Sequence, residues 1–209
     1  MSPNIYIIGA QSSGKTTLVQ ALETHFTNQH ETLSASAAPR FIKEVARKVL
    51  DKHGYTAEDI VTSPQRTLQL QKLIIEAQAR AEYEPANSDT PATNATCPPS
   101  FISDRSAIDP VVYARQYVGL QESQGLLELP EWRQMHKRMQ ASLIILCEPR
   151  SDWLKSDGVR LMPRDNEEWM LTHKLFCDVL NEVGLSFVVL SEGMSDIKVR
   201  VGFVLEHIE

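Results

Sequence analysis

Residues 9–17, GAQSSGKTT, lie directly between an apolar run, IYII, and a segment that reads LVQALETHF. They contain the pattern Gly-x-x-x-x-Gly-Lys-Ser/Thr, which in proteins cradles the phosphates of a nucleotide. That mechanism needs a strand, a glycine-rich turn and a helix in this order. Leu18, Leu22 and Phe26 recur at helical spacing, and isoleucines precede Gly9. The context therefore favours a nucleotide-binding loop over a simple glycine-containing turn with a solvated lysine.

The residue types of this phosphate loop (residues 9–17) match what phosphate binding requires. Gly9 and Gly14 allow turn conformations that a Cβ resists, so that backbone N–H groups can point at phosphate oxygens. A helix that begins near Lys15 adds the positive end of its dipole, and the lysine itself reaches the β- and γ-phosphates. The Thr16 hydroxyl is expected to ligate Mg²⁺. The predicted nucleotide-binding residues are Gly9, Gln11, Ser12, Ser13, Gly14, Lys15, Thr16 and Thr17.

Composition and charge are those of an ordinary globular protein. The chain has 209 residues, 42% hydrophobic and 23% charged, which suits a single domain over 1–209. A net charge of -6 gives no general attraction for nucleic acid or an anionic membrane, so neither is an expected partner. The first expected strand leaves no room for a signal peptide, and no stretch approaches the roughly 18 apolar residues of a membrane span. A cytoplasmic location is therefore expected, and the oligomeric state stays open.

Apolar strands alternate with helices along the chain. The expected strands are 5–8, 101–104, 141–148 and 185–191, with a weaker one near 33–37. The expected helices follow the phosphate loop and then cover 40–54, a long segment from Ser63 and Pro64 to about residue 84, 109–119, 130–140 and a segment from Asp165. This alternation predicts a three-layer α/β fold with a mainly parallel sheet.

A proline-rich segment interrupts this pattern at residues 85–100, PANSDTPATNATCPPS. It contains four prolines and almost no large apolar side chain. Such a segment cannot bury enough surface to offset its ordering entropy. It is expected to form a mobile surface insertion.

Several polar residues are expected at the carboxyl ends of the strands, where parallel sheets bind ligands. Asp104 ends an apolar strand, which is the place of a second Mg²⁺ ligand, although a strand-ending aspartate can also cap a helix. Arg105 is a candidate for contacting phosphate or substrate, with a surface salt bridge as the alternative. Arg160 and Arg164 lie in a polar loop that suits a lid over the phosphates, or is simply exposed.

Further candidates lie on predicted helices. Glu44 would accept the proton of an attacking hydroxyl if it lies near the sheet, and would be inert on a solvated helix face. One of the glutamines at 65, 69, 71 and 78 could recognise a base or an amide, although such residues usually decorate a helix surface.

Four segments, GAQSSGKTTL, FIKEVARKVL, ISDRSAIDPVVYA and DGVR, together resemble a P-loop ATPase/kinase family. This family includes the ribosylnicotinamide kinase domain of bacterial NAD-salvage proteins and is related to nucleoside and nucleotide kinases. The resemblance implies a P-loop NTPase fold with a five-stranded sheet in the order 2-3-1-4-5, and ATP and Mg²⁺ as cofactors. It also implies Lys15 and Thr16 at the phosphates and metal, Asp104 at the metal or acceptor hydroxyl, Glu44 near the acceptor and Arg160 in the lid.

Two features depart from that family. The bacterial proteins carry an adenylyltransferase or DNA-binding domain that is absent from this sequence, and the 85–100 insertion differs from their compact form. The resemblance therefore does not carry over nicotinamide riboside as the substrate.

Two functions follow. The first is an ATP- and Mg²⁺-dependent phosphotransferase that acts on a hydroxyl of a small, nucleoside-like metabolite. The alternative is an ATP-dependent switch or regulatory ATPase that binds a protein partner. A kinase needs a pocket beside the γ-phosphate, with Glu44 or Asp104 within reach and residues such as Tyr113, Tyr117 or Trp132 as walls. A guanine-specific GTPase is disfavoured because the sequence has no Asn-Lys-x-Asp motif.

Overall fold

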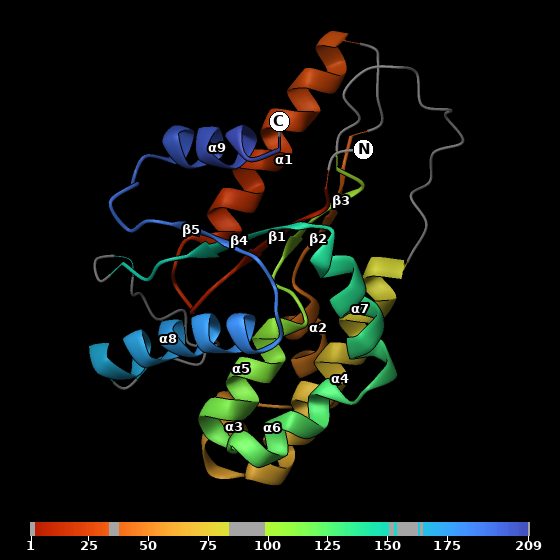
Figure 1. The fold of residues 1–209 in the computed structure, drawn as a ribbon, viewed down its shortest axis with the longest axis vertical. Coiled ribbons are helices and arrows are strands. Elements are labelled where there is room, and N and C mark those ends of the chain that lie inside the picture. Colours follow the sequence, from red (N-terminus) through yellow and green to blue (C-terminus); the bar gives the residue numbers. More distant parts are fainter. Residues whose placement is uncertain are drawn as a thin grey trace.

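The structure, a computed structural model, describes residues 3–33, 38–83, 99–150, 153, 163 and 165–208. Five parallel strands form one sheet in the order β2-β3-β1-β4-β5 (Figure 1). The strands are β1 (Ile5–Ile8), β2 (Arg40–Ile42), β3 (Phe101–Asp104), β4 (Leu143–Cys147) and β5 (Val188–Leu190). The sheet and its strand order confirm the expected P-loop NTPase fold.

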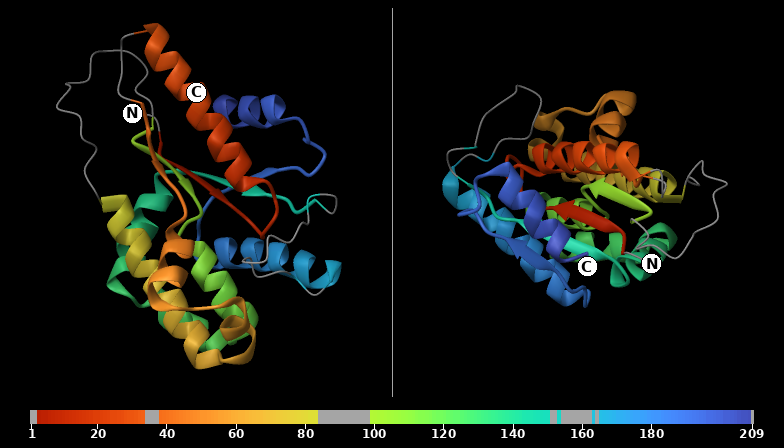
Figure 2. Two further views of the ribbon diagram at one scale, coloured as in Figure 1. Left: turned by 180° about the vertical axis from the view of Figure 1, so that it is seen from behind. Right: turned by 90° about the horizontal axis from the view of Figure 1, so that it is seen from above.

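Helices cover both faces of the sheet. On one side lie α1 (Lys15–Leu33) and α9 (Ile197–Glu206). On the other side lie α4 (Pro64–Tyr83), α5 (Ile108–Tyr117), α7 (Pro130–Gln140) and α8 (Asn166–Glu182), as the left view in Figure 2 shows. The predicted three-layer arrangement is therefore confirmed.

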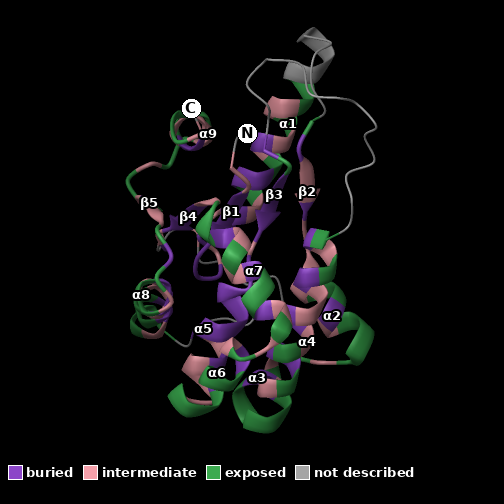
Figure 3. Cartoon of the chain, turned by 45° about the vertical axis from the view of Figure 1, so that its right-hand side comes forward, coloured by how far each residue is buried: buried purple, intermediate pink, exposed green. Residues whose placement is uncertain are grey.

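The alternation of side chains along β1 builds the two cores. Ile5 and Ile7 pack in the cluster under α1 and α9, whereas Tyr6 and Ile8 pack in the cluster on the opposite face. All four side chains are fully buried, because a parallel sheet between two helical layers exposes neither face (Figure 3).

A helical extension stands at one end of the molecule, beyond the sheet (Figure 1). It contains α2 (Val45–His53), α3 (Ala57–Thr62) and α6 (Leu120–Leu127) together with the first half of α4. Val49, Ile60, Leu70 and Ile74 form its own small core. Residues of α2, α3 and α4 line one cavity together with residues of the phosphate loop, so the extension lies next to that loop.

The second strand lies elsewhere than predicted. Residues 40–54 are not one helix, because Arg40 and Ile42 pair with Phe101 and Ser103 of β3. The helix α2 begins only at Val45. The second strand of the sheet is therefore Arg40–Ile42; of the strand expected near 33–37, Leu33 belongs to the end of α1, and 34–37 lie outside the described residues. Edge pairing with β3, which helical periodicity cannot reveal, decides the conformation of this segment.

Other boundaries agree closely with the sequence. Gly54 ends α2 in the left-handed conformation (φ 64°), and the Asp165 side chain accepts a hydrogen bond from the Glu168 N–H at the start of α8. Of the predicted insertion 85–100, only Pro99 and Ser100 belong to the described residues. Over the described part of the chain, no helix combines the length and the apolar character needed to cross a bilayer.

Candidate functional site

The phosphate loop connects β1 to α1, and two close contacts explain its glycines. Gly9 has φ 134°, and a Cβ there would lie 2.6 Å from the backbone oxygen of Cys147 on β4. Gly14 has φ 78°, and a Cβ there would lie 2.6 Å from the Trp153 ring. Both the conformation and the space therefore require glycine at these positions.

Two buried side chains from distant helices hold the loop. The Trp169 indole N–H donates to the Gln11 backbone oxygen (2.8 Å), and Arg200 Nη2 donates to the Ser13 backbone oxygen (3.1 Å). Because a peptide group is planar and trans, the N–H groups that follow these carbonyls point away from the two anchors. The anchors therefore fix the direction of loop N–H groups that phosphate oxygens need.

Neither anchor was predicted from the sequence. Arg200 lies one helical turn before the buried Val204, and it is itself only 2% exposed. A charged residue on the apolar face of a helix is the signal that would have revealed it. Trp169 shares the buried face of α8 with Phe176, which made it look like an ordinary core residue.

Lys15 is buried at the phosphate loop, and nearby carboxylates balance its positive charge only in part. Its Nζ donates to the Ala10 backbone oxygen and to Ser13 Oγ (3.2 Å). Burial, together with the nearby Arg105 charge, lowers the Lys15 pKa to about 8, although Asp104 and Asp109 act against this shift. A buried ammonium of this kind is stabilised by a phosphate anion.

This pKa predicts a pH-dependent affinity for nucleotide. A bound phosphate raises the lysine pKa, so above pH 8 binding requires uptake of a proton that the free protein has lost. We expect Mg·AMP-PNP to bind about tenfold more weakly at about pH 9 than at about pH 7. Calorimetry in two buffers of different ionisation enthalpy should show uptake of close to one proton at the higher pH and almost none at the lower. Equal affinity and no proton uptake at both pH values would contradict the prediction.

Thr16, in the first turn of α1, lies beside Asp104 at the carboxyl end of β3. Thr16 Oγ1 donates to Asp104 Oδ2 (2.7 Å), while the buried Asp104 Oδ1 has no partner among the described residues. A buried carboxylate oxygen without a partner is costly, and a hard cation or its bound water would satisfy it. The hydroxyl and the carboxylate therefore fit Mg²⁺, whose other ligands would be phosphate oxygens and water.

A cavity of about 220 Å³ extends from the phosphate loop to the helical extension. Its lining includes Ser12, Glu44 and Arg105, with φ angles of 57°, 60° and 87°. Within the described part of the chain, these are the non-glycine residues with positive φ. Each such conformation costs about 1–3 kcal/mol, and strain of this kind gathers at functional sites. Its concentration around one cavity marks this place as the candidate site.

Glu44 and Arg105 both line this cavity, each with a charged neighbour. Glu44 lies in the connection between β2 and α2, not on a solvated helix face, and its carboxylate pairs with Arg47 Nε (3.1 Å). Arg105 pairs with Asp109 (3.0 Å), whose side chain is only 4% exposed. The salt bridge considered for Arg105 thus exists, but at the cavity rather than at an outer surface.

The remaining candidates divide into those at the cavity and those elsewhere. Gln71 and Gln78 are buried and line it, whereas the glutamines at 65 and 69 are exposed. Tyr113 lines it too, whereas Tyr117, also expected as a wall, is not among the lining residues and stacks parallel to Tyr113 at 6.5 Å.

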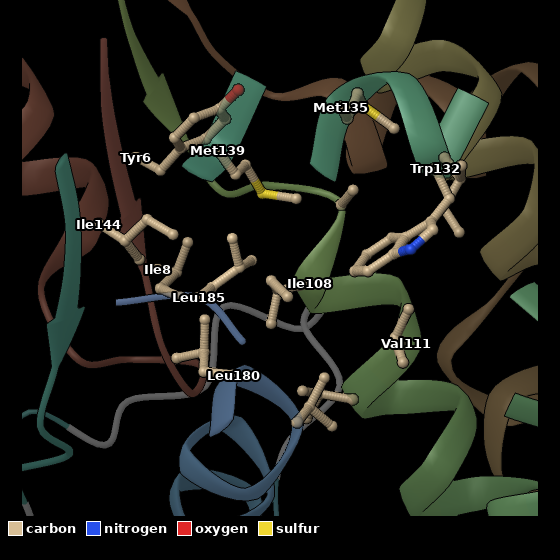
Figure 4. Close-up of a cluster of buried hydrophobic side chains, with 14 of the residues drawn as sticks. Tyr6, Ile8, Ile108, Val111, Trp132, Met135, Met139, Ile144, Leu180 and Leu185 are labelled. Carbon is tan, nitrogen blue, oxygen red and sulfur yellow. The ribbon is translucent and has the colours of Figure 1, made fainter. Parts of the chain in front are cut away.

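Trp132 is not a wall of the cavity, so that expectation is wrong. Its indole is buried in the core below the sheet, with Met135, Ile108 and Val111 (Figure 4). Helix α7 packs against α4, and its Trp132 side chain joins this core cluster instead of the cavity lining. Arg160 and Arg164, predicted in a lid, lie outside the described residues.

Comparison with known proteins supports the fold. The model of a family described as AAA domain matches residues 4–196. The NadR protein in complex with NAD and AMP-PNP is 22% identical with a TM-score of 0.67, covering 99% of this chain and 49% of that one. A structure of NadR in complex with NR is also 22% identical, with a TM-score of 0.68, and the match covers 99% of this chain and 52% of that one. The chain thus spans about half the length of these NadR chains.

A third solved structure matches over nearly its whole length. Deoxyadenosine kinase from M. mycoides, with dCMP and dCDP bound, is 12% identical with a TM-score of 0.57, covering 98% of this chain and 97% of that one. No curated protein sequence matches the chain. At these identities the structural likeness establishes the fold.

Proposed function

Because the chain belongs to the AAA domain family, we propose that it is an ATP- and Mg²⁺-dependent phosphotransferase acting on a hydroxyl of a small, nucleoside-like metabolite. One observation carries this proposal: a single cavity joins Lys15 and Thr16 of the phosphate loop to Glu44 and to apolar residues of α4. A nucleotide switch needs no such space beside the terminal phosphate, whereas a kinase must hold its acceptor there.

The residues around the cavity suit an in-line transfer. The acceptor oxygen forms a bond to the γ-phosphorus, the bond from that phosphorus to the β–γ bridging oxygen breaks, and ADP leaves. The hydroxyl proton passes to the Glu44 carboxylate. Lys15 and Arg105 stabilise negative charge on the phosphoryl oxygens, while Thr16 and Asp104 would hold Mg²⁺. When bound, Mg²⁺ neutralises further charge on the phosphates.

The chemistry of the cavity wall supports a flat, partly polar acceptor. Leu70 and Ile74 offer apolar surface, and Gln78 adds an amide. Gln78 Nε2 already donates to Glu82 Oε1 (3.0 Å) and Ser103 Oγ (3.0 Å), which fixes the amide orientation and leaves its carbonyl oxygen as an acceptor. A phosphoryl-acceptor substrate with an amino or carboxamide N–H could donate a hydrogen bond to this Gln78 oxygen.

The structural neighbours are consistent with this acceptor class. One NadR structure contains NR, and the deoxyadenosine kinase structure contains deoxycytidine nucleotides. The deoxycytidine nucleotides carry a sugar hydroxyl and a ring with an exocyclic amine. We therefore extend the proposal to nucleosides with such a ring, without preferring one of them.

The direct test is acceptor-dependent release of ADP from Mg·ATP. A panel should contain purine and pyrimidine nucleosides, pyridine nucleosides and vitamin-like alcohols, with a blank that lacks an acceptor. We expect one class to raise ADP release above the blank and to gain the mass of one phosphoryl group. ATP binding with no acceptor effect across the panel would remove the kinase proposal and favour the regulatory ATPase.

Glu44→Gln should separate chemistry from binding. The amide keeps the shape but cannot take the hydroxyl proton, so kcat should fall about 10²- to 10⁴-fold while AMP-PNP affinity changes less than about twofold. Steady-state kinetics with the identified acceptor and calorimetry measure the two quantities. Glu58→Gln, on an exposed position of α3, is the matched control and should retain wild-type kcat. Unchanged turnover in Glu44→Gln would exclude Glu44 from the mechanism.

A further inference from the structure

Gln11, near the start of the phosphate loop, carries a buried donor without a partner. The residue is 4% exposed and lines the cavity. Its Oε1 accepts a hydrogen bond from the Tyr113 hydroxyl (3.1 Å), while its Nε2 has no partner among the described residues. An amide N–H₂ group that is buried and unpaired is costly. Its presence at the wall of a cavity therefore points to a ligand that accepts a hydrogen bond from it.

The orientation of this amide follows from its neighbours. Burial raises the pKa of Tyr113, so the phenol keeps its proton. The Arg105 guanidinium interacts with the same phenolic oxygen and can only donate to it. The phenolic proton must therefore go to an acceptor, which is Gln11 Oε1, and the amide nitrogen faces the other way.

The backbone and the side chain of Gln11 are both fixed. The Trp169 indole N–H holds its backbone oxygen at 2.8 Å, and Tyr113 holds its side-chain oxygen. Residues from α8 and α5 thus place one amide without relying on any neighbour in the loop. A donor fixed in this way needs no reorganisation when charge develops in front of it.

The position of Gln11 indicates which phosphate it meets. It lines the same cavity as Glu44 and Gln78, which are proposed to face the acceptor. The phosphoryl group nearest an acceptor is the terminal one. We propose that Gln11 Nε2 donates a hydrogen bond to an oxygen of the γ-phosphoryl group, as a catalytic residue that stabilises the charge spread over that group during transfer. This inference rests on the proposed function, because the place of the acceptor assigns the contact to the γ-phosphoryl group; the binding measurements test that contact separately from phosphoryl transfer.

Binding measurements isolate the contact. Gln11→Met retains much of the side-chain volume but has no donor, so its affinity for Mg·AMP-PNP should fall about tenfold while its affinity for Mg·ADP stays within about twofold. The difference between the two nucleotides reports the terminal phosphate alone. Equal weakening of both would show that Gln11 only supports the loop, and an unchanged affinity for both would exclude the contact; either result overturns the proposal.

Kinetics test the catalytic part. Once the phosphoryl acceptor is identified, kcat of Gln11→Met should be about 10²- to 10³-fold lower than that of the wild type. This is the effect of removing one hydrogen-bond donor to an oxygen on which negative charge develops. Tyr113→Phe keeps the amide but frees it to rotate, so we expect a smaller loss of kcat and a smaller loss of AMP-PNP affinity. A wild-type kcat in Gln11→Met would overturn the catalytic role even if the binding contact is found.

The two proposals fail differently. If no acceptor is phosphorylated but Gln11→Met still discriminates between AMP-PNP and ADP, the proposed kinase function fails and the γ-phosphate contact stands. If phosphorylation occurs and the variant binds both nucleotides as the wild type does, only the contact fails. Gln11→Asn, which keeps an amide but withdraws it, replaces Gln11→Met if the latter does not fold, and the same pattern is expected.

Discussion

We expect Lys15→Met to reduce phosphoryl transfer about a thousandfold or more, because the variant lacks the only positive side chain of the phosphate loop. Nucleotide affinity should fall about 10- to 100-fold, which is the effect of losing hydrogen bonds to a charged group. ADP release with the identified acceptor and calorimetry with AMP-PNP measure the two effects.

Lys15→Met should lose activity without losing thermal stability. Burial lowers the pKa of Lys15 to about 8, so at neutral pH the folded, ligand-free protein holds a charge that is more stable in the unfolded chain. Methionine removes that cost, and we expect a Tm at least as high as that of the wild type. Lys52→Met, at an exposed position of α2, is the control and should leave turnover unchanged. A Lys15→Met protein that turns over normally would disprove the assignment of the phosphate loop.

Asp104→Asn should have the second-largest effect. The amide still accepts a hydrogen bond from Thr16 Oγ1, but it is neutral and binds Mg²⁺ poorly. We expect kcat at a fixed, low Mg²⁺ concentration to fall about 10²- to 10³-fold, with partial recovery as the concentration rises. Activity measured over a Mg²⁺ titration checks this.

A second comparison separates metal binding from nucleotide binding. In the presence of a chelator, Asp104→Asn and wild type should bind ATP about equally, because the carboxylate acts on the nucleotide through the metal. Asp51→Asn, exposed on α2, should match the wild type throughout. If the Mg²⁺ dependence of Asp104→Asn is the same as that of the wild type, the unpaired Asp104 Oδ1 does not bind the metal.

The parts of the site that depend on contiguous residues could be predicted from the sequence. The phosphate loop and the strand that ends at Asp104 each carry their geometry within a few residues, so their pattern is visible locally. The sheet order came from the resemblance, because nothing in a single strand states which neighbour it pairs with. The positions of the phosphate loop after β1 and of Asp104 at the end of β3 agree with the alternation of strands and helices read from the sequence.

The parts that depend on distant contacts could not be predicted. The strand β2 (Arg40–Ile42) has three residues, too few for a period, and its pairing with β3 decides its conformation. The same limit applies to Trp132, whose direction is set by how α7 packs. The orientation of the Gln11 amide depends on Tyr113, which is 102 residues away.

The Trp153 ring lies against Gly14, so its fluorescence should respond to the state of the phosphate loop. Guanidinium groups of Arg150 and Arg200 lie over the indole at 5.5 and 4.9 Å from its centroid. A second indole, Trp169, touches the loop through Gln11, so two of the three tryptophans sense its state. Intrinsic fluorescence of the unlabelled chain, with Trp132 replaced by Phe, therefore offers a direct titration signal for every nucleotide considered above.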